Sequence, residues 1–302
     1  MSEKISIRVG IIGLDTNHVV QFTELLNDPT HQFHVTGATV TVAYPGGSAD
    51  FPLSYQRLPD FQRTLESQYG VTMVDSEEAV ADAADAILLE SVDGRVHVAQ
   101  FARIAPAGKP VFIDKPLAVS SRDADAIGEL ADRYHVPVFS ASALRYAESL
   151  DSALTELGEM PMGADFYGPM PWEPPTPGWF WYGIHVVEML YRALGPGCYA
   201  VQALSTPGGD LLVGIWKDGR LGTARGYRGH NTLFGGQLHG RQNTTVVDIR
   251  RDRVSYYARL LQQIVTMFDT KKVPVPFAET REIIRFLEAA QESWYAGHPV
   301  AL

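Results

Sequence analysis

The feature that most constrains this chain is a regular alternation of short apolar segments and amphipathic segments in its first half. The apolar segments are rich in Ile and Val, which is typical of strands buried on both faces of a parallel sheet. The predicted strands are residues 5–14, 34–44, 71–74, 85–91, 109–114 and 136–141. Segments with the apolar spacing of helices separate them, at residues 19–28, 58–70, 76–82, 96–108 and 120–135. This order predicts a doubly wound parallel sheet with right-handed crossovers.

The pattern changes after about residue 145. Residues 168–178, GPMPWEPPTPG, contain five prolines and exclude a regular element there. Helices are predicted at residues 145–158, 181–195, 257–270 and 278–297. Alternating segments typical of strands lie at residues 199–206, 210–219, 220–229, 232–240 and 244–250. We therefore expect an α/β chain with two domains: a dinucleotide-binding type of domain over 1–142, and an α+β domain with an open, mostly antiparallel sheet over 143–302.

Charge and composition exclude several classes of protein. The net charge of −10 disfavours general nucleic-acid binding. No apolar run approaches the ~20 residues that span a bilayer, and the start of the chain has no long apolar signal-peptide core. We therefore expect a cytoplasmic protein with neither a nucleic-acid nor a membrane partner. Cys198 is the only cysteine, so an internal disulfide is impossible, and a buried filler is expected rather than a nucleophile.

The turn after the first strand, GLDTNH, departs from the dinucleotide-binding pattern. That pattern expects glycines at positions 13, 15 and 18, but the chain has Gly13, Asp15 and His18. Asp15, Thr16 and Asn17 are all N-capping types, and the free N–H groups at a helix start attract anions. The turn can still receive a phosphate if the Asp15 carboxylate points away. A turn that binds no dinucleotide is the alternative.

The second strand ends at Tyr44, where dinucleotide folds contact a ribose. An acid in this position selects NAD, but here Asp50 stands several residues further along. The choice between NAD and NADP therefore stays open.

Polar residues follow two other strands. Asp114 and Lys115 stand at the end of one predicted buried strand, and Glu90 and Ser91 at the end of another. Ligands bind at the carboxyl ends of strands in such sheets, so these side chains are candidate site residues.

A further candidate lies on the helix predicted at 181–195. His185 and Glu188 are three residues apart and share a face of it. Such a pair can hold a metal, but no third ligand is near it in the sequence, so no metal is expected.

Several motifs, taken in order, resemble one family. These are the GIIG strand, AGKPVFIDKP, SALRYAES, the GIHVVE helix and the closing SWYAGHPVAL. They resemble the glucose-fructose oxidoreductase, inositol dehydrogenase and rhizopine-catabolism proteins, the Gfo/Idh/MocA family. The chain differs from the family where Asp114 replaces the usual Glu of E-K-P, and where Trp181 stands in place of an Asp.

The resemblance implies an N-terminal Rossmann domain and reversible hydride transfer between NAD or NADP and a hydroxyl carbon of a sugar, cyclitol or polyol. It implies that Lys115 orients and polarises the substrate hydroxyl and that His185 is the general acid/base. Implied cofactor contacts are Gly13, Asp15, Thr16, Asn17, His18, Tyr44, Ser91, His97, Asp114 and Lys115. Implied substrate contacts are Arg145, Tyr146, Trp181, Tyr182 and Glu188. It also implies a homo-oligomer, a dimer or tetramer, formed through the C-terminal sheet.

Two alternatives follow from the departures at positions 15, 18 and 181. The first is a catalytically weak relative that binds a nucleotide or sugar as a sensor or partner subunit. The second is a lyase or hydrolase that uses a retained cofactor only transiently.

Overall fold

The computed structural model describes residues 6–302, so Ile5 of the first predicted strand lies outside the described part. The described chain forms two compact units. The first unit comprises residues 6–118, 122–141 and 257–277; the second comprises residues 119–121, 142–256 and 278–302. The segment 257–277, which we expected in the second domain, therefore belongs to the first unit.

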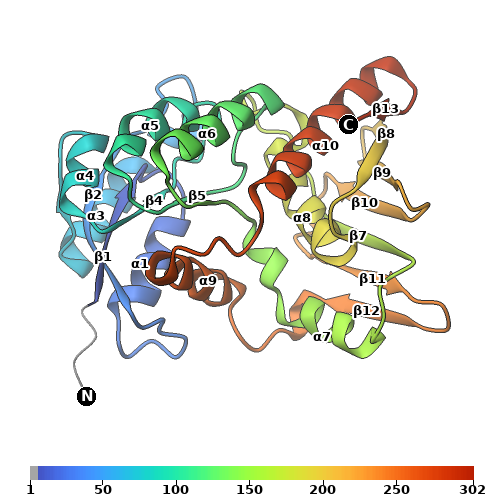
Figure 1. The fold of residues 1–302 in the computed structure, drawn as a ribbon, viewed down its shortest axis with the longest axis horizontal. Coiled ribbons are helices and arrows are strands. Elements are labelled where there is room, and N and C mark those ends of the chain that lie inside the picture. Colours follow the sequence, from blue (N-terminus) through green and yellow to red (C-terminus); the bar gives the residue numbers. More distant parts are fainter. Residues whose placement is uncertain (1–5) are drawn as a thin grey trace. The chain divides into compact units, whose positions relative to one another are not determined.

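The first unit is built on a six-stranded sheet in the order β3-β2-β1-β4-β5-β6 (Figure 1). Every neighbouring pair is parallel, as predicted. The strands are β1 (Ile7–Ile12), β2 (Ala38–Tyr44), β3 (Thr72–Met73), β4 (Ala86–Leu89), β5 (Val111–Ile113) and β6 (Val138–Phe139). The order reverses between β1 and β4, and a sheet of this kind binds its ligand at the carboxyl ends of the strands beside that point.

Helices cover this sheet. They are α1 (His18–Asn27), α2 (Pro52–Tyr55), α3 (Leu58–Tyr69), α4 (Glu77–Ala83), α5 (His97–Ile104), α6 (Ser121–Tyr134) and α9 (Tyr256–Thr270). Helix α4 begins as predicted, because the Ser76 hydroxyl accepts a hydrogen bond from the Ala79 N–H. Helix α3 ends at Gly70, whose φ of 66° favours glycine.

Helix α9 lies beside α1 in Figure 1, and the Tyr257 ring stands edge-on to the rings of His18 and Phe22. Sequence periodicity identified α9 as an amphipathic helix but carries no information on which sheet it covers.

The second unit contains a seven-stranded sheet in the order β12-β11-β7-β10-β9-β8-β13. Its strands are β7 (Gly163–Pro169), β8 (Cys198–Thr206), β9 (Gly209–Trp216), β10 (Leu221–Tyr227), β11 (Gly235–His239), β12 (Thr244–Asp248) and β13 (Val300–Ala301). All neighbours are antiparallel except β7 and β10, which confirms the predicted open, mostly antiparallel sheet. Strand β7 was not predicted, because its sequence GADFYGP has weak alternation and runs into the proline-rich segment.

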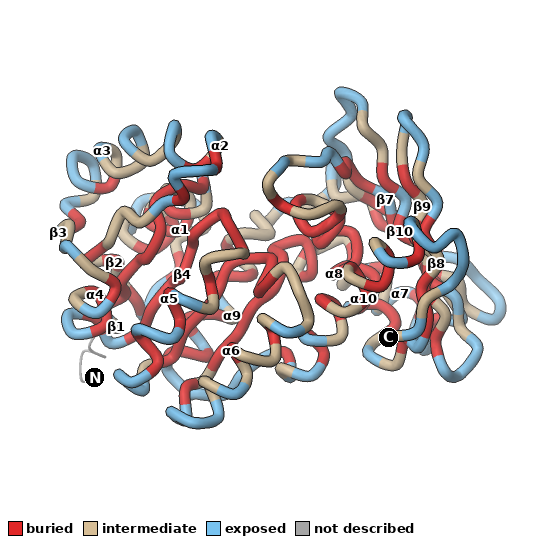
Figure 2. The backbone as a smooth tube through the Cα atoms, turned by 90° about the horizontal axis from the view of Figure 1, so that it is seen from above, coloured by how far each residue is buried: buried red, intermediate tan, exposed pale blue. Residues whose placement is uncertain are grey.

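Helices α7 (Glu148–Leu157), α8 (Gly183–Leu194) and α10 (Phe277–Ala296) belong mainly to this unit. Short 3-10 turns lie at Ala105–Ala107, Ala143–Tyr146, Gly178–Phe180 and Ile249–Arg251. Helix α8 packs on β7 and β10, and nearly all of its residues are buried (Figure 2). Strand β9 alternates buried and partly exposed residues, so one face of the sheet is core and the other is partly open to solvent. Within residues 6–302, none of the helices has both the length and the apolar character required to cross a bilayer.

Candidate active site

The turn between β1 and α1 is closed by backbone contacts. The N–H groups of Gly13 and Leu14 donate to the carbonyls of Tyr44 and Pro45, at 3.0 and 2.8 Å. Gly13 has a φ of 86°, and a Cβ there would stand 2.3 Å from the Ser91 hydroxyl. The first glycine of the fingerprint is therefore required by both conformation and space.

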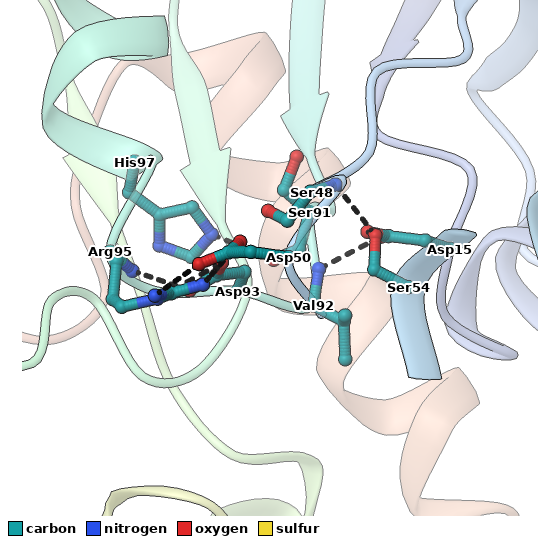
Figure 3. A network of polar contacts seen from close by, with 9 residues as sticks. All are labelled: Asp15, Ser48, Asp50, Ser54, Ser91, Val92, Asp93, Arg95 and His97. Carbon is teal, nitrogen blue, oxygen red and sulfur yellow. Dashed lines mark hydrogen bonds and ion pairs between the residues drawn. The ribbon is translucent and has the colours of Figure 1, made fainter. Parts of the chain in front are cut away.

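Asp15, at the second glycine position, is fully buried. Its carboxylate accepts hydrogen bonds from the Ser54 hydroxyl at 2.5 Å and the Val92 N–H at 2.8 Å (Figure 3). Burial raises the pKa of Asp15, and these two hydrogen bonds oppose the rise. The carboxylate thus points into the protein and joins the loops that follow β1, β2 and β4.

The start of α1 fits an anionic dinucleotide. Asn17 is exposed and its side chain does not cap the helix, and the His18 N–H makes only a 3.5 Å contact with the Thr16 hydroxyl. The Ser91 hydroxyl, beside Gly13, is buried without a hydrogen-bond partner. A helix N-terminus and an unpartnered hydroxyl are the groups that a phosphate or ribose engages.

A second polar network fixes the loop after β4 (Figure 3). The Arg95 guanidinium donates to the carboxylates of Asp93 and Asp50. Burial raises the pKa of Asp93, but the hydrogen bonds from Arg95 and Ser48 outweigh it and the pKa is lowered.

His97 belongs to the same network and is fully buried. Its two ring nitrogens lie 3.1 Å from the Leu117 carbonyl and 2.8 Å from the Ser91 carbonyl. His97 and Asp15 were predicted to contact the cofactor. Both side chains are buried, and through their contacts within the protein they connect the loops around the site.

A buried cluster lies at the carboxyl ends of β4 and β5. The His18 Nδ1 atom is 3.0 Å from Asp114 Oδ2 and 3.9 Å from Glu90 Oε2. Burial raises the pKa of Glu90 well above its ordinary value, and the nearby Asp114 raises it further. Burial also tends to raise the pKa of Asp114. The interaction with His18 outweighs the effect of burial, so the pKa of Asp114 is lowered.

Lys115 follows directly after Asp114 and is 7% exposed. Burial lowers the pKa of Lys115, while Asp114 and Glu90 oppose that change. The first unit therefore brings together four side chains that the sequence had suggested separately.

In the second unit, His185 lies on α8. Its Nδ1 atom is 2.6 Å from the Ser142 hydroxyl, and its ring stands edge-on to Tyr182 and Phe234. The Ser142 hydroxyl also accepts the Leu144 N–H. These contacts fix the orientation of the imidazole.

Arg145 and Glu188, which we expected to contact the substrate, form a buried ion pair. They are buried with Glu279, and Arg145 donates to both carboxylates, at 3.0 Å in the case of Glu188. Burial raises the pKa of Glu188, and Arg145 opposes the rise. Sequence spacing placed Glu188 on the face of His185 but gave no sign of its ion pair with Arg145.

The other predicted substrate residues differ in exposure. Trp181 is buried, while Tyr146 and Tyr182 are partly exposed. Burial raises the pKa of Tyr146. Sequence reasoning also missed Ser54, Ser142 and Glu279, because a partner that is distant along the chain leaves no local pattern.

The parallel sheet, its reversal of strand order and the glycine turn define a dinucleotide-binding domain. Residues 7–142 match the family model GFO_IDH_MocA, described as an oxidoreductase family with an NAD-binding Rossmann fold. Over these residues, a little under half of the chain, the protein is similar to the Gfo/Idh/MocA family. The match confirms the resemblance, the oxidoreductase class and the nicotinamide type of cofactor that we expected. A search of curated protein sequences gave no match.

Solved structures share the fold over nearly the whole chain. A myo-inositol 2-dehydrogenase from Lactobacillus plantarum is 17% identical with a TM-score of 0.79, covering 99% of this chain and 100% of that one. A scyllo-inositol dehydrogenase from Lactobacillus casei is 13% identical with a TM-score of 0.77, covering 99% and 98%. An oxidoreductase from Agrobacterium radiobacter, in complex with NAD⁺, L-tartaric acid and magnesium, is 16% identical with a TM-score of 0.75, covering 98% of each chain. At these identities the likeness is one of fold.

Proposed function

We propose that this protein transfers a hydride between NAD or NADP and a hydroxyl carbon of a sugar, cyclitol or related polyol. The observation that carries the proposal is the buried Lys115 beside Asp114 at the carboxyl end of β5, in a domain of an NAD-binding family. A buried ammonium group is costly, so its position at the ligand-binding edge favours a chemical role. The inositol dehydrogenases that share the fold support the substrate class.

The dinucleotide would be held by the start of α1, with Thr16 and Asn17, and by Gly13, Tyr44 and Ser91. When bound, its nicotinamide ring accepts or donates the hydride. Asp15 keeps its charge inside the protein, which removes a repulsive group from the phosphates.

In the proposed reaction, Lys115 orients the substrate hydroxyl and stabilises the negative charge that develops on its oxygen. His185 accepts the hydroxyl proton during oxidation and returns it during reduction. The Ser142 hydroxyl at Nδ1 holds the imidazole in place for this transfer.

The proposal is tested by titrating the protein with NADH and NADPH and following nicotinamide fluorescence, then by assaying a panel of polyols and sugars with NAD⁺ and NADP⁺. We expect saturable binding and substrate-dependent reduction of the cofactor. Binding without turnover on any polyol or sugar would support the catalytically weak relative, and absence of both would overturn the proposal.

A homo-oligomer through the sheet of the second unit is also proposed. Apolar side chains lie on the face of the sheet opposite α8, including Leu204, Leu221 and Val246, which are 56%, 53% and 67% exposed. Such a patch favours burial against a second copy. Light scattering should show a dimer or tetramer that Val246→Arg dissociates, whereas Met160→Arg, at an exposed apolar residue in a loop, should not. A monomeric parent protein would contradict this proposal.

The cytoplasmic location expected from the sequence is likewise a proposal.

A further inference from the structure

Three side chains of the first unit present ligand atoms to one point. His18 starts α1, Glu90 follows β4 and Asp114 follows β5. One potential ligand atom from each lies within 4.8 Å of the other two. Ligands about 2.1 Å from a tetrahedral metal ion stand roughly 3.4 Å from one another, and the measured separations of 3.0 and 3.9 Å lie on either side of that value.

Several buried polar atoms of this cluster have no hydrogen-bond partner. Glu90 is fully buried and neither of its carboxylate oxygens has a hydrogen-bond partner. Asp114 Oδ1 is buried without a hydrogen-bond partner as well, and His18 Nδ1 contacts Asp114 Oδ2 at 3.0 Å. Buried polar atoms are almost always paired in native proteins, so three unpartnered carboxylate oxygens beside an imidazole indicate a missing ligand.

The donor set selects the kind of ligand. An imidazole and two carboxylates suit a divalent first-row transition metal, because imidazole favours such ions over Mg²⁺ and Ca²⁺. A doubly charged ion, together with the nearby Lys115, also offsets the charge of the two carboxylates that the fold has buried. The negative charges of the two carboxylates exclude a phosphate from this cluster.

We propose that His18, Glu90 and Asp114 bind one divalent transition-metal ion, of the Zn²⁺ or Mn²⁺ type. Three protein ligands leave coordination positions open, which is the arrangement of a metal that contacts water or a substrate oxygen. His18 then occupies the third glycine position because the imidazole is needed there as a ligand. This inference does not depend on hydride transfer.

The test uses the whole chain, stripped with a chelator and titrated with Zn²⁺ alone by calorimetry, with metal content measured after dialysis. We expect one equivalent per chain and a rise in Tm on metal addition. His18→Asn, Glu90→Gln and Asp114→Asn should each weaken binding at least about 100-fold.

The matched control is His239→Gln. His239 Nε2 forms a 2.7 Å pair with Asp165, but both side chains are half-exposed and no third ligand joins them among the described residues. That variant should keep the affinity and the Tm rise of the parent protein.

The variant Glu90→Gln distinguishes a role of Glu90 in metal binding from a role in the stability of the fold. The substitution removes an unpaired buried acid, so the metal-free variant should fold at least as stably as the parent while losing the Tm rise on metal addition. Absence of one-to-one binding, unchanged affinity in all three ligand variants, or equal affinity for Mg²⁺ and Zn²⁺ would overturn the proposal. None of these results bears on the binding of NADH.

Discussion

Each unit of this protein buries two carboxylates beside a basic side chain, and the two groups differ in how completely they are paired. In the second unit, Arg145 donates to both Glu188 and Glu279. In the first unit, His18 contacts Asp114, and Glu90 has no hydrogen bond. A planar guanidinium has enough donors to satisfy two carboxylates, whereas in the first unit both oxygens of Glu90 lack a hydrogen bond although His18 and Lys115 are near. We conclude that the Arg145 group of the second unit is completed by the fold, and the His18 group of the first unit by a ligand.

The largest effect should come from removing the centre of the paired group. Arg145→Met leaves Glu188 and Glu279 buried without their counter-ion, and we expect a loss of about 3–5 kcal/mol in the free energy of unfolding. Urea denaturation followed by circular dichroism measures this loss. Lys217→Met, at an exposed lysine, serves as the control. A loss below about 1 kcal/mol would show that Arg145 is not a structural counter-ion.

A smaller loss is expected at the turn after β1. Asp15→Ala removes the acceptor of the Ser54 O–H and the Val92 N–H and should cost about 2–3 kcal/mol. Asp15→Asn keeps one acceptor oxygen and should cost less. Thermal and urea unfolding of the two variants measure the difference. Equal stability of Asp15→Ala and the parent protein would contradict the positioning role.

Substitution of Glu90 should change the free energy of unfolding in the opposite direction from substitution of Arg145. Glu90→Gln removes charge from a site without hydrogen bonds, so the unfolding free energy of the metal-free protein should stay equal or rise by about 1 kcal/mol. The measurement is urea unfolding in the presence of a chelator. A loss comparable to that of Arg145→Met would mean that Glu90 is already paired in the native protein.

The smallest effect concerns Cys198. Burial raises the pKa of the Cys198 thiol to about 12. Since the thiolate is the reactive form, the folded protein should show almost no alkylation at pH 8, and unfolding in urea should restore reaction at a free-thiol rate. Mass spectrometry after iodoacetamide treatment measures both. Fast modification of the folded protein would contradict the prediction of a buried filler.

The sequence predicted those parts of the fold that depend on local periodicity. Strands β1 and β4 and the helices between the strands follow from apolar spacing, whereas β7 was missed for lack of alternation. The sequence also did not show that α9 packs in the first unit. This placement depends on the aromatic contacts of Tyr257 with His18 and Phe22.

The candidate site was predictable residue by residue but not as an arrangement. Lys115 and Asp114 were identified from their position at a strand end, and His18 from its departure from glycine. Their convergence with Glu90 depends on the order of the strands in the sheet, which no local pattern encodes. The same reason explains why the ion pair between Arg145 and Glu188 was not predicted from the sequence.

The central claim is that the strand-end group of the first unit performs the chemistry. The most direct measurement compares Lys115→Met with the parent protein, using NADH affinity and the rate of polyol-dependent cofactor reduction. The account predicts that NADH affinity changes less than about threefold, while the rate falls by at least about 100-fold. A variant that keeps the parent rate would contradict it.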